Sequence, residues 1–158
     1  KVTTIPKGAR SRAWMGASDL AEYTIAADVR GARTQDQLPD IGLTAHGYVL
    51  DLKGQDQQLQ IRSWSAQERM ASEVRFPWQE DVWYRMKLRV DIESEPPAAV
   101  ALLRGKVWPR DQDEPKEWTI TARDESPNLA SSPGLYGNAK VAELYLDNIE
   151  VTENSDEP

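Results

Sequence analysis

Hydrophobic and polar residues alternate without interruption over residues 82–92, the sequence Val-Trp-Tyr-Arg-Met-Lys-Leu-Arg-Val-Asp-Ile. Successive side chains of a β-strand point to opposite faces. One face of this segment would therefore carry Tyr84, Met86, Leu88, Val90 and Ile92, and the other Trp83, Arg85, Lys87, Arg89 and Asp91. One buried and one solvated face is typical of an antiparallel sheet, so the pattern predicts a strand of such a sheet.

Similar patterns, separated by turn residues, cover most of the remaining chain. They predict strands at 23–30, 41–45, 48–53, 57–64, 70–76, 98–108, 117–122, 134–137 and 143–151. Short strands at this spacing favour an all-β fold, an antiparallel two-sheet β-sandwich of the jelly-roll type. We expect a single domain over residues 1–152, followed by a solvated tail at 153–158.

Composition narrows the possible functions. The chain has 158 residues and a formal net charge of -7. Such an acidic chain lacks the basic footprint that general nucleic-acid binding requires. It contains no cysteine, which excludes disulfides, cysteine-ligated zinc and thiol catalysis. No apolar run approaches the roughly 18 residues of a membrane-spanning helix.

Four motifs occur together and in order in the C-terminal half: Leu103-Arg-Gly-Lys-Val-Trp-Pro109, Glu114-Pro-Lys-Glu-Trp118, Ser132-Pro-Gly-Leu-Tyr-Gly137 and Tyr145-Leu-Asp-Asn-Ile149. With Asp40-Ile-Gly-Leu43, Gly54-Gln-Asp56 and residues 83–89, they resemble a concanavalin-A/laminin-G-like jelly-roll module of exported bacterial proteins. The likeness spans about residues 5–152. It implies a sandwich with one concave face, an extracytoplasmic setting and a larger multidomain chain, often with a quinoprotein-type propeller. A wider relative is the 3-keto-disaccharide hydrolase-like domain, none of whose catalytic residues can be placed here.

The candidates for catalysis are few. His46 is the only histidine, and no Gly-x-Ser-x-Gly elbow is present, so a Ser-His-Asp hydrolase lacks its parts. Asp91, Glu93 and Glu95 would share one strand face, and two carboxylates about 5 Å apart would suit a retaining glycosidase. Because a double proline follows at once, a solvated hairpin turn is the favoured interpretation, with a glycoside-processing enzyme as the alternative.

Hard oxygen ligands gather in the loop after the strand at 98–108. Asp111, Asp113 and Glu114 lie in this loop, and Asp147 lies in the last predicted strand. One interpretation is a structural calcium site formed by Asp111, Asp113 and Asp147. The loop lacks the glycine of an EF-hand, so the favoured alternative is an acidic loop that keeps the sheet edge soluble. No other cofactor is indicated.

Cationic and aromatic side chains on the solvated strand faces suggest a binding surface. If the strands at 57–64, 83–91 and 98–108 are neighbours in one sheet, a shared surface would be formed by Arg62, Trp64, Arg85, Lys87, Arg89, Arg104 and Lys106. Aromatic rings stack on sugars, and guanidinium forks bind carboxylates and sulfates. The alternative is a structural face whose cations pair with Asp and Glu across the strands.

Five further aromatic residues are interpreted as core or edge packing rather than as ligand contacts. These are Trp14, Trp78, Trp83, Trp118 and Tyr136.

We therefore expect a non-catalytic, extracytoplasmic module that binds a carbohydrate, such as an anionic polysaccharide, or a cell-surface partner on its concave sheet. The alternative from another class is a docking domain that packs against an attached propeller. We expect no nucleic-acid partner and no membrane-spanning segment.

Overall fold

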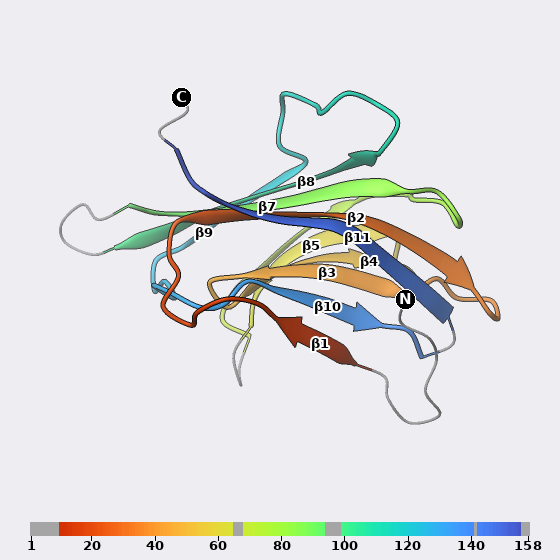
Figure 1. Ribbon diagram of the computed structural model, residues 1–158, viewed down its shortest axis with the longest axis horizontal. Helices are drawn as coiled ribbons and strands as arrows, with labels where there is room; N and C mark the ends of the chain where they lie inside the picture. The colour runs from red at the N-terminus through yellow and green to blue at the C-terminus, as the bar shows by residue number, and fades with distance from the viewer. Residues whose placement is uncertain (1–9, 65–67, 94–98, 141, 156–158) are drawn as a thin grey trace.

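The computed structural model describes residues 10–64, 68–93, 99–140 and 142–155, and it places eleven strands in two antiparallel sheets that lie face to face (Figure 1). The six-stranded sheet has the order β1 (Ser11–Trp14), β10 (Gly134–Asn138), β3 (Asp40–Ala45), β4 (Tyr48–Lys53), β5 (Gln58–Ser63), β6 (Ala71–Arg75). The five-stranded sheet has the order β11 (Ala142–Glu153), β2 (Tyr23–Arg33), β7 (Tyr84–Glu93), β8 (Val100–Pro109), β9 (Ile120–Asp124). The predicted two-sheet β-sandwich is confirmed.

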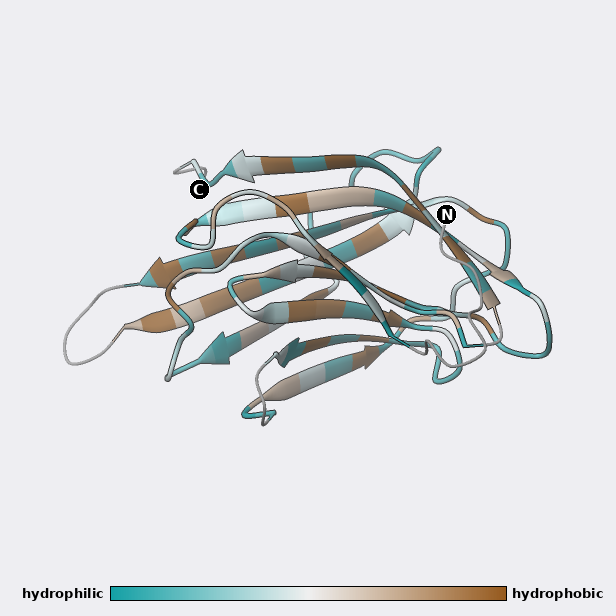
Figure 2. Cartoon of the chain, turned by 60° about the horizontal axis from the view of Figure 1, so that its bottom comes forward, coloured by the Kyte–Doolittle hydropathy of each residue, from teal (hydrophilic) through white to brown (hydrophobic). Residues whose placement is uncertain are grey.

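The core lies between the sheets and follows from the alternation of each strand. Along β7, Tyr84, Met86, Leu88 and Val90 are buried, while the residues between them are partly exposed. The same alternation appears in Figure 2 as brown and teal bands along the strands. Burying one large aliphatic side chain stabilises the fold by about 1.5–3 kcal/mol, so the apolar faces hold the two sheets together.

One strand was not predicted. The edge strand β1 pairs with β10, with Trp14 opposite Gly134, but three of its four residues are exposed. Such a segment has no buried face, so no hydrophobic alternation marks it in the sequence.

The predicted tail at 153–158 begins too early. Glu153 belongs to β11, and Asn154 donates hydrogen bonds from Nδ2 to the Val90 carbonyl at 2.8 Å and to Asp91 Oδ1 at 2.9 Å. The side-chain amide of Asn154 thereby holds the chain end against the five-stranded sheet. The last three residues lie outside the described part.

The β4–β5 turn packs tightly against the segment that precedes β3. The Gly54 amide donates to Asp40 Oδ1 at 2.9 Å, and the indole of buried Trp78 donates to the Lys53 carbonyl at 3.1 Å. A Cβ atom on Gly54 would collide with the backbone carbonyl oxygens of Leu38 and Pro39. The close approach of two backbone segments therefore requires glycine at this position.

Among the described residues, there is no helix with the length and apolar character needed to cross a bilayer.

Candidate functional site

The sheets divide the seven predicted binding residues between two opposite surfaces. Arg85, Lys87 and Arg89 lie on β7, and Arg104 and Lys106 lie on β8, all in the five-stranded sheet. Arg62 lies on β5 of the six-stranded sheet, and Trp64 directly follows that strand. The prediction of one surface shared by all seven residues is therefore wrong.

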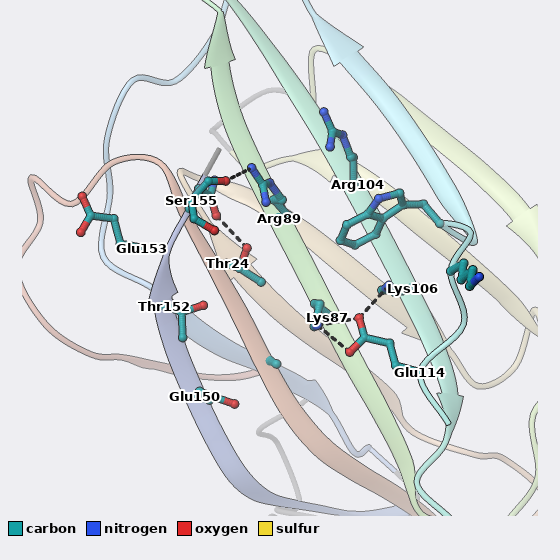
Figure 3. Close-up of a pocket in the computed structure, with 14 residues that line it drawn as sticks. Thr24, Lys87, Arg89, Arg104, Lys106, Glu114, Glu150, Thr152, Glu153 and Ser155 are labelled. Atoms are coloured by element: carbon teal, nitrogen blue, oxygen red, sulfur yellow. Dashed lines mark hydrogen bonds and ion pairs between the residues drawn. The ribbon is translucent and has the colours of Figure 1, made fainter. Parts of the chain in front are cut away.

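Four of these cations line a cavity of about 370 Å³ on the outside of the five-stranded sheet, which we call the outer groove (Figure 3). Its floor holds Lys87 opposite Lys106 and Arg89 opposite Arg104, in register across β7 and β8. The β8–β9 loop, which stands away from the sheet in Figure 1, contributes Glu114, Lys116 and Trp118. The opposite wall is formed by Thr24 and by residues 150 and 152–155.

The outer groove is locally positive although the chain is acidic. Five cationic side chains line it against three acidic ones. Salt screens exposed charges over about 8 Å at physiological ionic strength, so this local excess matters more to a bound ligand than the net charge of the chain.

Glu114 reaches from the loop to both lysines of the floor (Figure 3). Its carboxylate accepts from Lys87 Nζ at 2.6 and 2.7 Å and lies 2.7 Å from Lys106 Nζ. Burial by itself would raise the pKa of Glu114, but its bonds to Lys106 and Lys87 outweigh burial and hold the pKa below its ordinary value. Lys106 also donates to the Pro115 carbonyl at 2.9 Å, and its ammonium lies 4.5 Å from the centre of the Trp118 ring.

The two arginines of the floor differ in how closely other residues bind their guanidinium groups. Arg89 Nε donates to both oxygens of Asp91, at 3.0 and 2.9 Å, and its NH2 group donates to the Ser155 carbonyl at 3.1 Å. Arg104 is 34% exposed, and its guanidinium is 4.0 Å from the Asp91 carboxylate. Arg104 is thus bound less closely than Arg89 and remains partly accessible from the groove.

Arg85 does not line the outer groove, and it binds carboxylates other than those of Glu114 and Asp91. It pairs with the buried Asp28 at 3.3 Å and with Glu150 at 3.0 Å. Asp28 also accepts from Asn148 Nδ2 at 2.6 Å and lies 3.5 Å from Arg110 NH1. The Asp28 side chain on β2 therefore connects this strand to β7, to β11 and to the base of the β8–β9 loop.

Hydroxyl and amide groups complete the wall of the outer groove. Thr24 Oγ1 donates to Asn154 Oδ1 at 2.7 Å, and Thr152 projects beside them from β11 (Figure 3). Cations, hydroxyls and an indole together can bind acid groups, sugar hydroxyls and sugar ring faces. None of these wall residues was predicted, because the pairing of β2 with β7 brings Thr24 to the cations and the pairing of β11 with β2 brings the others.

The other surface, on the six-stranded sheet, is filled by its own side chains. The guanidinium carbons of Arg12 and Arg62 lie 3.9 and 4.7 Å from the Trp64 ring centre, and the Tyr136 ring lies 5.4 Å from it. Arg62 in turn binds the buried Asp51 at 3.2 Å. The side chains of Trp64 and Arg62 are therefore engaged with each other and with the sheet.

The outcome for the aromatic residues is mixed. Trp78 and Tyr136 are buried as packing residues, and Trp83 is partly buried. Trp14 is 56% exposed on the edge strand β1, and Trp118 lines the outer groove, so neither is a core residue. The sequence places Trp118 in a strand because it alternates with Ile120. In the structure β9 begins only at Ile120, and Trp118 lies in the preceding loop.

The predicted calcium site is not formed. Within the described ranges, no three His, Asp or Glu side chains converge to hold a metal ion. Asp111 and Asp113 are exposed in the β8–β9 loop, and Asp147 Oδ1 accepts from the Asn148 amide at 2.9 Å. Asp147 thus stabilises the backbone where the β11–β2 register shifts.

The carboxylates considered for glycoside hydrolysis have other contacts. Asp91 is bound by Arg89 and Asn154, and Glu93 lies 3.8 Å from Arg123. Glu95 and the double proline lie outside the described residues. His46 is fully buried and does not line the outer groove.

The buried Asp51 gives a first prediction. Burial, followed by repulsion from Asp40, raises the pKa of Asp51 from 3.8 to about 7, although Arg62 lowers it. The folded state then binds this proton more tightly than the unfolded chain, so the free energy of unfolding decreases as the pH rises from about 4 to 7. We expect Asp51→Asn to melt about 3–6 °C above the wild type at pH 8 and to lose this advantage near pH 4. Thermal melts across this pH range measure the effect, and a lower melting temperature for the variant at pH 8 would contradict it.

Comparison with known proteins finds similarity in structure but not in sequence. No known family model matches the chain, and no curated protein matches it. The structure is similar to a galectin of Caenorhabditis elegans, LEC-6 (7% identity, 92% of this chain and 99% of that chain, TM-score 0.55). It is also similar to sheep galectin-11 in complex with glycerol (6% identity, 94% and 100% coverage, TM-score 0.55) and to an ancestral congerin (11% identity, 89% and 99% coverage, TM-score 0.50). At these identities the similarity establishes a shared jelly-roll β-sandwich fold.

Proposed function

We propose that this chain is a non-catalytic carbohydrate-binding module whose outer groove binds a glycan that carries acid groups. The proposal rests on one observation, the four cations that face each other in register across β7 and β8 on the groove floor. They lie beside an indole and a wall of hydroxyl groups. Guanidinium and ammonium groups bind carboxylates and sulfates, while hydroxyls and indole suit the sugar itself. That the structural neighbours are galectins supports a carbohydrate as the ligand.

The proposal also covers the cellular location of the module. The resemblance to modules of exported bacterial proteins supports an extracytoplasmic location within a larger chain. A surface polysaccharide rich in uronic acids or sulfate esters would then be accessible to the outer groove.

Binding to soluble polymers tests the proposed function. Polygalacturonate supplies carboxylates, dextran sulfate supplies sulfates, and dextran supplies the neutral comparison. We expect both acidic polymers to bind, with affinities that decrease as salt is added because exposed charges are screened. If no polymer binds in calorimetry at low salt, the proposed function is wrong.

Replacing the groove indole gives a second prediction. Trp118→Ala removes the ring against which a sugar would stack, and we expect affinity for polygalacturonate to decrease about threefold to tenfold. Trp14→Ala is the matched control because this exposed tryptophan lies on the six-stranded sheet. Equal losses for the two variants, measured by calorimetry, would contradict a role for Trp118 in the site.

A further inference from the structure

Two ammonium groups converge on one carboxylate in the outer groove, and that carboxylate does not belong to the sheet. Lys87 and Lys106 are cross-strand partners on β7 and β8, so their like charges would repel without an anion between them. Glu114 supplies the anion from the β8–β9 loop, with three contacts of 2.6 to 2.7 Å (Figure 3).

The burial of the three groups is unequal. The Lys106 side chain is 7% exposed and that of Lys87 is 26% exposed, whereas that of Glu114 is 41% exposed. A buried ammonium needs an anion nearby, but the anion here sits on the solvent side of the pair. An incoming acid group would therefore reach the same position from solution.

The backbone that carries Glu114 is not part of either sheet. Residues 110–119 lie between the end of β8 and the start of β9. Near Glu114, Lys106 binds the Pro115 carbonyl at 2.9 Å, and at the loop base the Gln112 amide donates to the Pro109 carbonyl at 3.0 Å. Displacing the Glu114 side chain leaves the sheet ladder intact.

We propose that Glu114 occupies the acid-group subsite of the outer groove in the free protein, and that a ligand carboxylate or sulfate replaces it between Lys87 and Lys106. This inference rests on the proposed function and adds the ligand group that the subsite selects. A neutral sugar cannot replace the carboxylate without leaving the buried Lys106 short of an anion, so the subsite excludes neutral glycans. Internal competition by Glu114 lowers the apparent affinity, because only the fraction with the subsite vacated can bind.

Neutralising the competitor tests the inference. Glu114→Gln keeps the size of the side chain but removes its charge, and we expect affinity for polygalacturonate and for dextran sulfate to increase at least about threefold. The matched control is Glu117→Gln, which removes the same charge from an exposed residue of the same loop. Thermal melts test whether both variants are folded, and calorimetry at one fixed salt concentration gives the affinities.

The outcomes separate the inference from the proposed function. An increase for Glu114→Gln and not for Glu117→Gln supports the inference, and an increase with only one polymer assigns the subsite to carboxylates or to sulfates. Equal changes for the two variants reflect general charge alone and overturn the inference while acidic polymers still bind the wild type. Wild-type binding to dextran as tight as to polygalacturonate also overturns it. Absence of binding to every polymer overturns the proposed function and the inference together.

Discussion

Lys106→Met is expected to weaken binding of acidic polysaccharides at least about tenfold, because an ionised hydrogen bond to a ligand acid group contributes about 1.5–3 kcal/mol. Lys106 is the most buried cation of the groove floor, and it lies between the carboxylate of Glu114 and the ring of Trp118. Methionine keeps most of the apolar stem, so the loss reports the charge rather than the packing.

A control separates this effect from the loss of a positive charge anywhere on the protein. Lys140→Met removes the same charge from an exposed residue that does not line the outer groove. Calorimetry with polygalacturonate should show near wild-type affinity for Lys140→Met. If Lys106→Met binds as tightly as this control, the outer groove is not the site.

Gly54→Ala is expected to destabilise the fold by about 3 kcal/mol, because the added methyl group meets backbone that cannot rotate away. The carbonyl oxygens of Leu38 and Pro39 occupy the space where the Cβ atom would lie, and the Gly54 amide is held by Asp40. Urea unfolding should show a lower midpoint with little change in slope.

The comparison variant is Gly16→Ala. Gly16 has a φ of 70°, but its added Cβ would meet only the flexible tip of Leu20 at 3.1 Å. We expect it to cost about 1 kcal/mol, the usual penalty for a left-handed backbone without glycine. A loss at Gly54 no larger than that at Gly16 would contradict the close backbone packing of the β4–β5 turn.

The predictability of the fold differs from that of the site for a physical reason. The alternation along β7 gave its buried and solvated faces correctly, because side-chain direction is a property of one strand. Alternation along β5 likewise placed Arg62 on a solvated face, but it carries no information about which sheet the strand joins. The outward faces of the two sheets lie on opposite sides of a sandwich. Arg62 and Trp64 therefore lie on the surface opposite to the five cations of β7 and β8.

The wall and the loop of the outer groove depend on contacts between distant parts of the chain. Thr24 and Asn154 are 130 residues apart, and no local pattern relates them. The sequence places Glu114 among the hard oxygen ligands of an acidic loop, whereas in the structure its carboxylate binds Lys87 and Lys106. Its two partners lie on neighbouring strands, so they can be identified only once β7 and β8 are paired.

The buried carboxylate of Asp28 acts as a tether between the two sides of the outer groove. Asn148 of β11 and Arg110 at the base of the β8–β9 loop both attach to its Oδ2 atom. The base of the β8–β9 loop and the strand that carries the opposite wall are thereby bonded to one buried side chain. At this end of the outer groove, the spacing between loop and wall is set by a single carboxylate, so a substitution of Asp28 would change both sides of the groove together.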